Sequence, residues 1–171
     1  IMISKKMLNT LNEQIKFEMY SAHLYLAMSA HIEHQGFKGM AKWLRVQYEE
    51  ETFHFLKFYD YIKSRGEKVI LKAIDAPPSD FGTPLETFRK VLEHEQQVTA
   101  GINKLYKIAL DENDFASQIF LQWFISEQVE EEDSTSEVLN KIQLIGDKPT
   151  DLLYLDNELG TRTFIPPSSN E

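Results

Sequence analysis

Acidic residues interrupt the apolar pattern of this sequence at positions where a helix buries its side chains. Four glutamates each take the place of an apolar residue, and His54 follows one of them, Glu51, by three residues. This spacing puts the imidazole and the carboxylate on one face of a helix. The four acidic residues are Glu18, Glu51, Glu95 and Glu131. Because several buried, ionised carboxylates are very costly without a cation, these residue types indicate a metal site.

Four long segments must position these residues, and each repeats apolar side chains at alternating spacings of three and four. This period predicts an all-α protein. Ser4 is a candidate N-cap of the first segment, and Thr83 starts the third, with Pro84 at the first helical position and Glu86 completing a capping box. The segments cover about residues 4–35, 38–65, 83–111 and 114–145.

Each of the four glutamates falls within about one turn of the midpoint of its own segment. A single glutamate in such a stripe is usually a side chain that reaches out to solvent, but four at one level with a histidine at i+3 favour a shared site. The stripe positions nearby contain no Lys or Arg to pair with them. Oxygen-rich ligation with one imidazole suits iron or manganese better than structural zinc.

The connections predict the topology of a bundle over about residues 4–145. Short links after the first and third segments favour antiparallel neighbours. The link over residues 66–83 has two prolines and no helical period. Extended, it reaches roughly 60 Å, more than the roughly 42 Å of a helix of about 28 residues. It can therefore cross the bundle from end to end, which makes the second and third helices parallel.

A short, leucine-rich fifth helix is expected over about residues 150–159, with Thr150 as its N-cap and Gly160 after its end. Its leucines either pack around a symmetry axis of an oligomer or dock on the chain's own bundle. These residues are Leu152, Leu153, Leu155 and Leu159. We expect residues 161–171 to form a mobile tail.

Composition limits the class of protein and its partners. With 171 residues, 42% hydrophobic, the whole chain 1–171 suits one domain. The net charge of -9 argues against nucleic acid or anionic membranes as general partners, and the absence of cysteine excludes thiolate metal sites. No uninterrupted apolar run predicts a membrane span. A cytoplasmic location is expected, although the start at Ile1-Met2 indicates that an upstream segment was cleaved or added.

From residue 4 to 160 the sequence resembles the non-haem ferritins of bacteria and archaea. The resemblance rests on four segments in the order and spacing of that family: "NEQIKFEMYSAHLYLAM" (12–28), "EEETFH" (49–54), "EHEQ" (93–96) and "FLQWFISEQVEEE" (120–132). It implies a ferritin-like four-helix bundle with one long crossover and a short C-terminal fifth helix. It also implies a ferroxidase that oxidises Fe(II) with O2 or H2O2 at a diiron centre within the subunit and stores Fe(III) mineral inside a homo-24-mer cage.

The resemblance also assigns the iron ligands. Glu18, Glu51 and His54 correspond to the ligands of the first iron, with Glu51 bridging. The ligands of the second iron correspond to Glu51, Glu95 and Glu131. This fourth helix lacks the second Glu-x-x-His of haem-containing bacterioferritins and rubrerythrins, so we expect a weakly held second iron that is processed as substrate.

Five further residues take roles by resemblance. Gln128 corresponds to a glutamine beside the centre that orients oxygen or water, and Tyr25 to a tyrosine with an electron-donor role. A third iron site shares Glu131 and adds Glu50, Glu127 and Glu130.

No haem is expected, because no methionine lies between Glu51 and His54, where bacterioferritins place their haem ligand. Two other functions remain open. One is a diiron oxygenase or peroxidase that retains its iron through turnover and stores no mineral. The other is a non-catalytic assembly whose acidic interior only collects cations.

Overall fold

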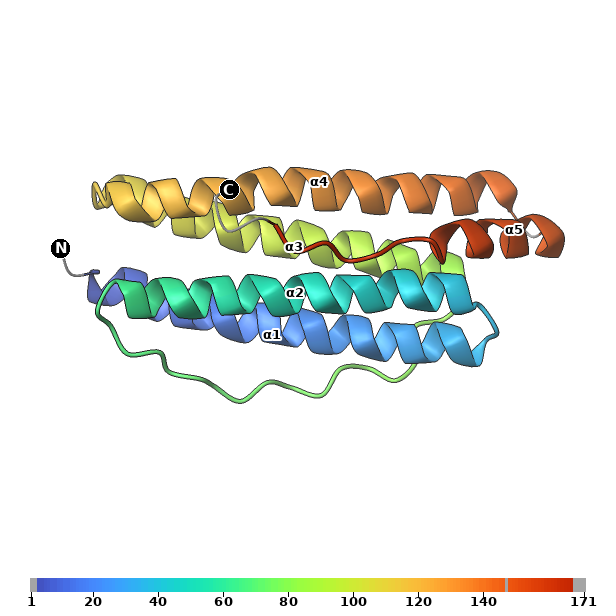
Figure 1. Ribbon diagram of the computed structural model, residues 1–171, viewed down its shortest axis with the longest axis horizontal. Helices are drawn as coiled ribbons and strands as arrows, with labels where there is room; N and C mark the ends of the chain where they lie inside the picture. Colours follow the sequence, from blue (N-terminus) through green and yellow to red (C-terminus); the bar gives the residue numbers. More distant parts are fainter. Residues whose placement is uncertain (1–2, 147, 168–171) are drawn as a thin grey trace.

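A computed structural model describes residues 3–146 and 148–167, which form five α-helices and no strand (Figure 1). None of these helices is both long enough and apolar enough to span a membrane. The helices are α1 (Lys5–His34), α2 (Lys38–Ser64), α3 (Pro84–Asp111), α4 (Phe115–Ile145) and α5 (Pro149–Leu159).

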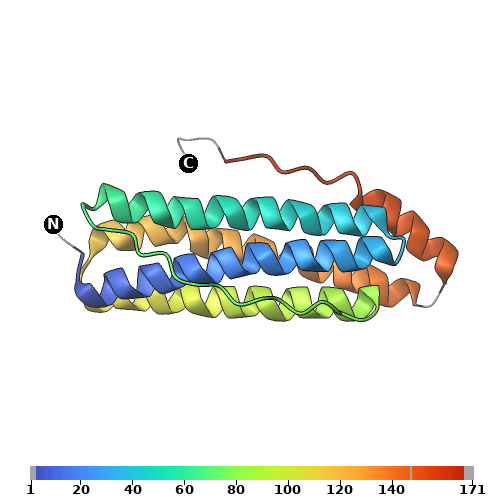
Figure 2. The same cartoon turned by 90° about the horizontal axis from the view of Figure 1, so that it is seen from below.

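The four long helices form a bundle in which α1 is antiparallel to α2 and α3 is antiparallel to α4 (Figures 1 and 2). The link between α2 and α3 runs the length of the bundle, so these two helices are parallel and the predicted single crossover is confirmed. This link is tied to α1, because the Asn12 side chain accepts a hydrogen bond from the Ile70 N–H (2.8 Å). Near its far end, His31 Nε2 is hydrogen-bonded to the Gly82 carbonyl (2.7 Å).

The predicted caps of the long helices are present. The Ser4 side chain accepts from the Met7 N–H, and the capping box of Thr83 and Glu86 is complete. The predicted N-cap of the short helix, Thr150, is wrong. The N-cap residue is Lys148, two residues earlier, and α5 starts with Pro149 at its first position, where a missing N–H costs nothing.

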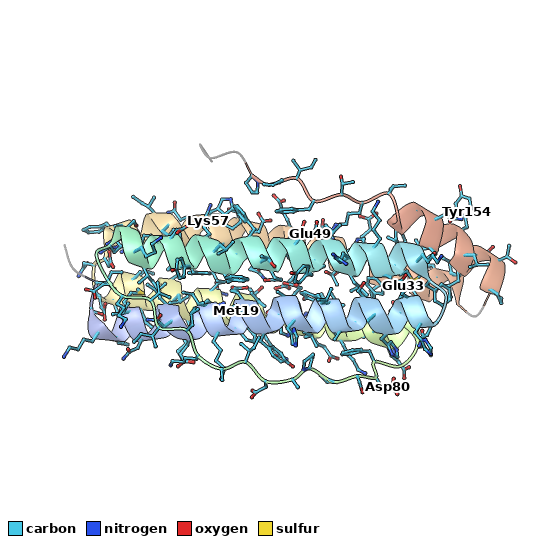
Figure 3. The ribbon with its side chains drawn as sticks, turned by 60° about the horizontal axis from the view of Figure 1, so that its bottom comes forward. Met19, Glu33, Glu49, Lys57, Asp80 and Tyr154 are labelled. Atoms are coloured by element: carbon cyan, nitrogen blue, oxygen red, sulfur yellow. The ribbon has the colours of Figure 1, made fainter. Side chains whose placement is uncertain are left out.

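Helix α5 docks on the bundle of its own chain. Leu155 and Leu159 are buried there, whereas Leu153 is 54% exposed and Tyr154 points away from the bundle (Figure 3). Leu155 and Leu159 therefore dock on the chain's own bundle and Leu153 lies at the surface of the single chain, so packing of α5 around a symmetry axis stays a prediction.

A tertiary hydrogen bond fixes this docking. Asp156 Oδ1 accepts from the Met40 N–H (2.7 Å), and so caps α2, whose own N-cap residue makes no side-chain bond. The approach is close enough to require Gly39, because a Cβ there would lie 1.6 Å from the Asp156 carbonyl oxygen. Helix α5 and the start of α2 therefore stabilise each other.

The core has two apolar clusters, one toward each end of the bundle. The predicted stripes of α1, α2 and α3 face inward almost throughout. The stripe of α4 is shifted, because Gln128 and Thr135 are buried while Glu127 and Ser134 are half-buried. Counted in steps of three and four from Phe124, the apolar pattern of this segment predicts Glu127, Glu131 and Ser134 as inward positions, whereas the structure buries Gln128, Glu131 and Thr135.

Beyond α5, residues 161–167 run back along α2 (Figure 2). The ring centroids of Phe164 and Phe53 are 6.3 Å apart. This part of the segment expected to be a mobile tail thus has side-chain contacts with α2, and its mobility stays a prediction. Residues 168–171 lie outside the described part of the chain.

Replacing Asp156 should weaken the docking of α5. We expect Asp156→Ala to cost about 1 kcal/mol, because the Met40 N–H loses its acceptor at the start of α2. The measurement is the midpoint of thermal unfolding, followed by the helical circular dichroism signal. Asp156→Asn retains an acceptor oxygen and should lose less. Equal midpoints for Asp156→Ala and the wild type would show that this cap contributes nothing.

Candidate metal centre

All four long helices contribute to a polar layer between the two apolar clusters. α1 supplies Glu18, α2 supplies Glu51 and His54, α3 supplies Glu95 and α4 supplies Glu131. These side chains are buried, and Glu131 is the most exposed of them at 4%. The convergence expected from their positions along the helices is therefore present, with the carboxylates shielded from water.

One ligand set has a geometry that suits a metal ion. Single ligand atoms of Glu18, Glu51 and His54 lie within 4.8 Å of one another. Glu18 Oε2 and Glu51 Oε1 are buried without any hydrogen-bond partner. Such orphaned atoms are rare because they lose their hydration without compensation. A cation at this point would satisfy both, so the residues present fit a bound metal.

A second ligand set adjoins the first and shares its histidine. It consists of His54, Glu127 and Glu131, again within 4.8 Å. This is not the predicted trio of Glu51, Glu95 and Glu131. The reason lies in the partners of Glu95, whose Oε1 accepts from the Tyr25 hydroxyl and whose Oε2 accepts from Gln128 Nε2 (3.1 Å). Protein donors therefore occupy this carboxylate.

Sequence reasoning missed the roles of two glutamines in this layer. Gln14 Nε2 donates to Glu18 Oε1 (2.7 Å), and Gln47 Nε2 donates to Glu131 Oε2 (2.9 Å) and lies 3.4 Å from Glu95 Oε1. For Gln14 a signal was available, since it precedes Glu18 by four residues, whereas Gln47 bonds glutamates of two other helices and had no local signal. The spacing of four puts the Gln14 amide one turn from the Glu18 carboxylate.

The remaining predicted site residues lie at the edge of the layer. Glu50 and Glu127 are half-buried, whereas Glu130 is exposed and belongs to neither ligand set. Glu50 is paired with the side chain of Arg162 from the C-terminal segment, at 2.7 Å. As expected from the sequence, no Lys or Arg lies at the inward positions of the described helices near the centre. No sequence signal indicated that Arg162, far along the chain, would pair with Glu50.

Lys57 is a second basic residue near the edge of the centre. Its Nζ lies 3.9 Å from the centroid of the Trp123 ring, and its charge acts on Glu127. The two cations therefore stand beside the outer carboxylates and not among the buried ones.

Burial controls the protonation of the centre. It is the largest cause that raises the pKa values of Glu18 and Glu51 well above the ordinary range, and neighbouring carboxylates add to it. Burial, then the negative charge of a neighbour, also raises the pKa values of Glu131 and Glu50 to about 7. The pKa of Tyr25 is raised by the same cause, so its phenol stays protonated. Without metal, this centre therefore holds protons.

Comparison with known proteins agrees with the motifs and the fold. A family model described as a ferritin-like domain matches residues 8–145. The bacterial non-heme ferritin of Staphylococcus aureus (strain MRSA252) is 42% identical over 163 residues, covering 95% of this chain and 98% of the relative. That of Bacteroides fragilis (strain 638R) is 44% identical over 161 residues, covering 94% and 100%.

Solved structures give the same result at the level of the backbone. An open-pore ferritin from the hyperthermophilic archaeon Archaeoglobus fulgidus superposes with a TM-score of 0.93 at 46% identity, covering 94% of this chain and 99% of that chain. A structure described as a humanized archaeal ferritin gives a TM-score of 0.94 at 45% identity, covering 96% and 99%. This chain therefore belongs to the ferritin family and, within it, to the non-haem ferritins.

Proposed function

We propose that this ferritin stores iron and has ferroxidase activity, with Fe(II) as its substrate and O2 or H2O2 as the oxidant. The observation that carries the proposal is the buried set of Glu18, Glu51 and His54, in which two carboxylate oxygens lack a partner. Without a cation, these atoms are satisfied only if the two buried carboxyl groups share a proton, as their raised pKa values allow. A bound cation would satisfy both.

The ligand chemistry favours oxidation. Anionic carboxylates stabilise Fe(III) more than Fe(II), because the attraction grows with the charge of the ion. Two Fe(II) ions supply two electrons, and O2 takes these and two protons to become H2O2. Carboxyl groups that hold protons in the metal-free centre release them when iron binds, so protons are available at the place of reduction.

The two proposed iron sites differ in whether their ligands are already close together without metal. For the first, Glu18, Glu51 and His54 are already close together. For the second we retain Glu51, Glu95 and Glu131, but Glu95 must first exchange its hydrogen bonds from Tyr25 and Gln128. The second iron is therefore held more weakly, which suits an ion that is oxidised and passed on.

The residues around the pair have distinct proposed roles. Gln128, released from Glu95, orients oxygen or water at the second iron. Tyr25, whose hydroxyl donates to Glu95 in the metal-free centre, keeps the electron-donor role that the resemblance implies. A third iron binds at the edge of the centre, between the half-buried and exposed carboxylates. Its ligands are Glu50, Glu127, Glu130 and Glu131.

Storage requires a cage, which we propose to be a homo-24-mer like those implied by the sequence resemblance. Several large apolar side chains of the described residues are strongly exposed, which in a monomer is typical of interaction surfaces. They include Phe115 (68%), Ile119 (70%), Val129 (68%) and Leu144 (88%).

The ferroxidase activity is tested by mixing anaerobic, Fe(II)-loaded protein with O2 and following Fe(III) absorbance by stopped flow. Oxidation should be much faster than in buffer. Glu18→Ala and His54→Ala should slow it by at least about tenfold, because the first ligand set is broken. Glu33→Ala, which removes an exposed carboxylate of α1, serves as the matched control and should keep the wild-type rate (Figure 3).

Two outcomes would contradict this function. Oxidation no faster than in buffer would exclude a ferroxidase. A fast reaction that stops once the ligand sites are full, with the iron retained afterwards, would instead favour the diiron oxygenase or peroxidase. Storage predicts continued uptake far beyond the capacity of the ligand sites.

The stability of the metal-free protein should depend on pH with a defined sign. Glu131 and Glu50 have folded-state pKa values of about 7, above the ordinary 4.5. Their contribution is therefore fully present below about pH 4.5 and is lost as the pH rises through about 7. As the pH rises from about 5 to about 8, the midpoint temperature of thermal unfolding should decrease. The decrease should be smaller in the double variant Glu50→Gln, Glu131→Gln. A flat or rising wild-type curve in this window would disprove this account of the charges.

Assembly is tested by size-exclusion chromatography with light scattering. The purified protein should elute as one cage-sized species, because the exposed apolar side chains are then covered. A monomer or dimer at micromolar concentration would rule out storage in a cage.

A further inference from the structure

The C-terminal segment lies on α2 in an orderly way. Over residues 161–165 exposed and half-buried side chains alternate, as in an extended strand with one face covered. Arg162 and Phe164 face the bundle, and Thr163 faces solvent. This segment is thus seated by alternate side chains, although it belongs to no helix.

Arg162 makes three contacts in its seat. Its Nη2 lies 2.7 Å from Glu50 Oε2, and its Nη1 donates to the Trp43 carbonyl (3.4 Å). Its Cζ lies 4.2 Å from the centroid of the Trp43 ring, a cation–π geometry. The side chains of Arg162 and Glu50 are only 22% and 18% exposed, so solvent screens this pair less than an ordinary surface pair.

The partner of Arg162 belongs to the edge of the metal centre. Glu50 directly precedes Glu51 in the chain. Burial, and then the negative charges of Glu131 and Glu127, raise its pKa. Burial also raises the pKa of Glu131, and the positive charge of Arg162 opposes this by favouring the ionised form. The guanidinium therefore supplies positive charge to the outer carboxylates in the metal-free protein. A metal ion at Glu50 competes with the guanidinium for this carboxylate, because Nη2 already bonds Oε2 and two cations at one carboxylate repel each other.

We propose that Arg162 is a positioning residue that holds Glu50 in place and is displaced by a metal ion, so that metal binding at the outer carboxylates releases the C-terminal segment. This inference rests on the proposed function, because it requires that these carboxylates receive metal. The coupling is reciprocal: the ion loosens the segment, and the seated segment weakens the binding of the ion.

This coupling has a consequence for an ion that passes through the centre. When iron leaves Glu50, the guanidinium returns to it, so the carboxylate does not remain uncompensated. Release of the ion from the outer site is thereby favoured over permanent retention. The segment acts as an exchangeable counter-ion, as expected where iron is substrate and not a fixed cofactor.

The experiment uses the absence of cysteine from the chain. A nitroxide attached to Thr163→Cys reports the motion of the segment by electron paramagnetic resonance. Zn(II), which takes no part in redox chemistry, is the probe. In the assembled wild-type background the label should be immobilised without metal and become mobile as Zn(II) binds. With Arg162→Met it should be mobile from the start, and Zn(II) affinity measured by calorimetry should rise by at least about fivefold.

Two further variants separate displacement from a general effect of charge. Glu50→Gln should leave the label mobile with and without Zn(II), because the partner of the guanidinium has lost its charge. Arg45→Met removes an exposed arginine of α2 and should change neither the label nor the affinity. If Zn(II) binds in the wild type and the label stays immobilised, the inference is overturned while the proposed metal centre stands. If calorimetry detects no Zn(II) binding, both are overturned.

Discussion

The structure depends on one constraint: carboxylates that are shielded from water must be compensated inside the bundle. An apolar cluster closes the layer on either side, so water cannot supply the compensation. Protons are one solution, and the raised pKa values of Glu18 and Glu51 show that the metal-free fold uses it. Metal ions are the other. Because both compete for the same oxygens, the centre is poised between a protonated and a metal-bound state.

The choice of hydrogen-bond donors keeps this balance open. Amides, a phenol and the His54 imidazole serve the buried carboxylates, and among the described residues no lysine or arginine does so within the layer. A neutral donor orients a carboxylate without cancelling its charge, so the attraction for a cation survives. A buried arginine would form a permanent ion pair that a metal could displace only at great cost. In the part of the chain that the structure describes, one guanidinium pairs with a site carboxylate, that of Arg162, and it comes from outside the helices, which is why we propose that it can be displaced.

Much of this arrangement could be predicted from the sequence, because helical periodicity and helix length are local properties. The level of Glu18, Glu51, Glu95 and Glu131 follows from counting residues in four helices. The register of α4 does not follow from the sequence alone, since Glu127 and Gln128 are neighbours and only packing against α3 decides which of them faces inward. The contacts of Asp156 and Arg162 had no local signal. Each depends on how a short C-terminal segment folds back on α2.

The carboxylates also form a series of increasing exposure, and in the proposed function this order gives iron a direction. Glu51 is fully buried, Glu131 is 4% exposed, Glu127 is half-buried and Glu130 is exposed. An ion is bound most tightly where it meets the most unsatisfied oxygens and least water, and its affinity falls as solvent screens the charge. In the proposed function, the iron that leaves first is therefore the one in the weaker second ligand set, which lies nearer the exposed end of this series. Because the ligands lie on rigid helices, the order of their exposure is fixed. At the exposed end of this series, the part that we propose to move is the side chain of Arg162.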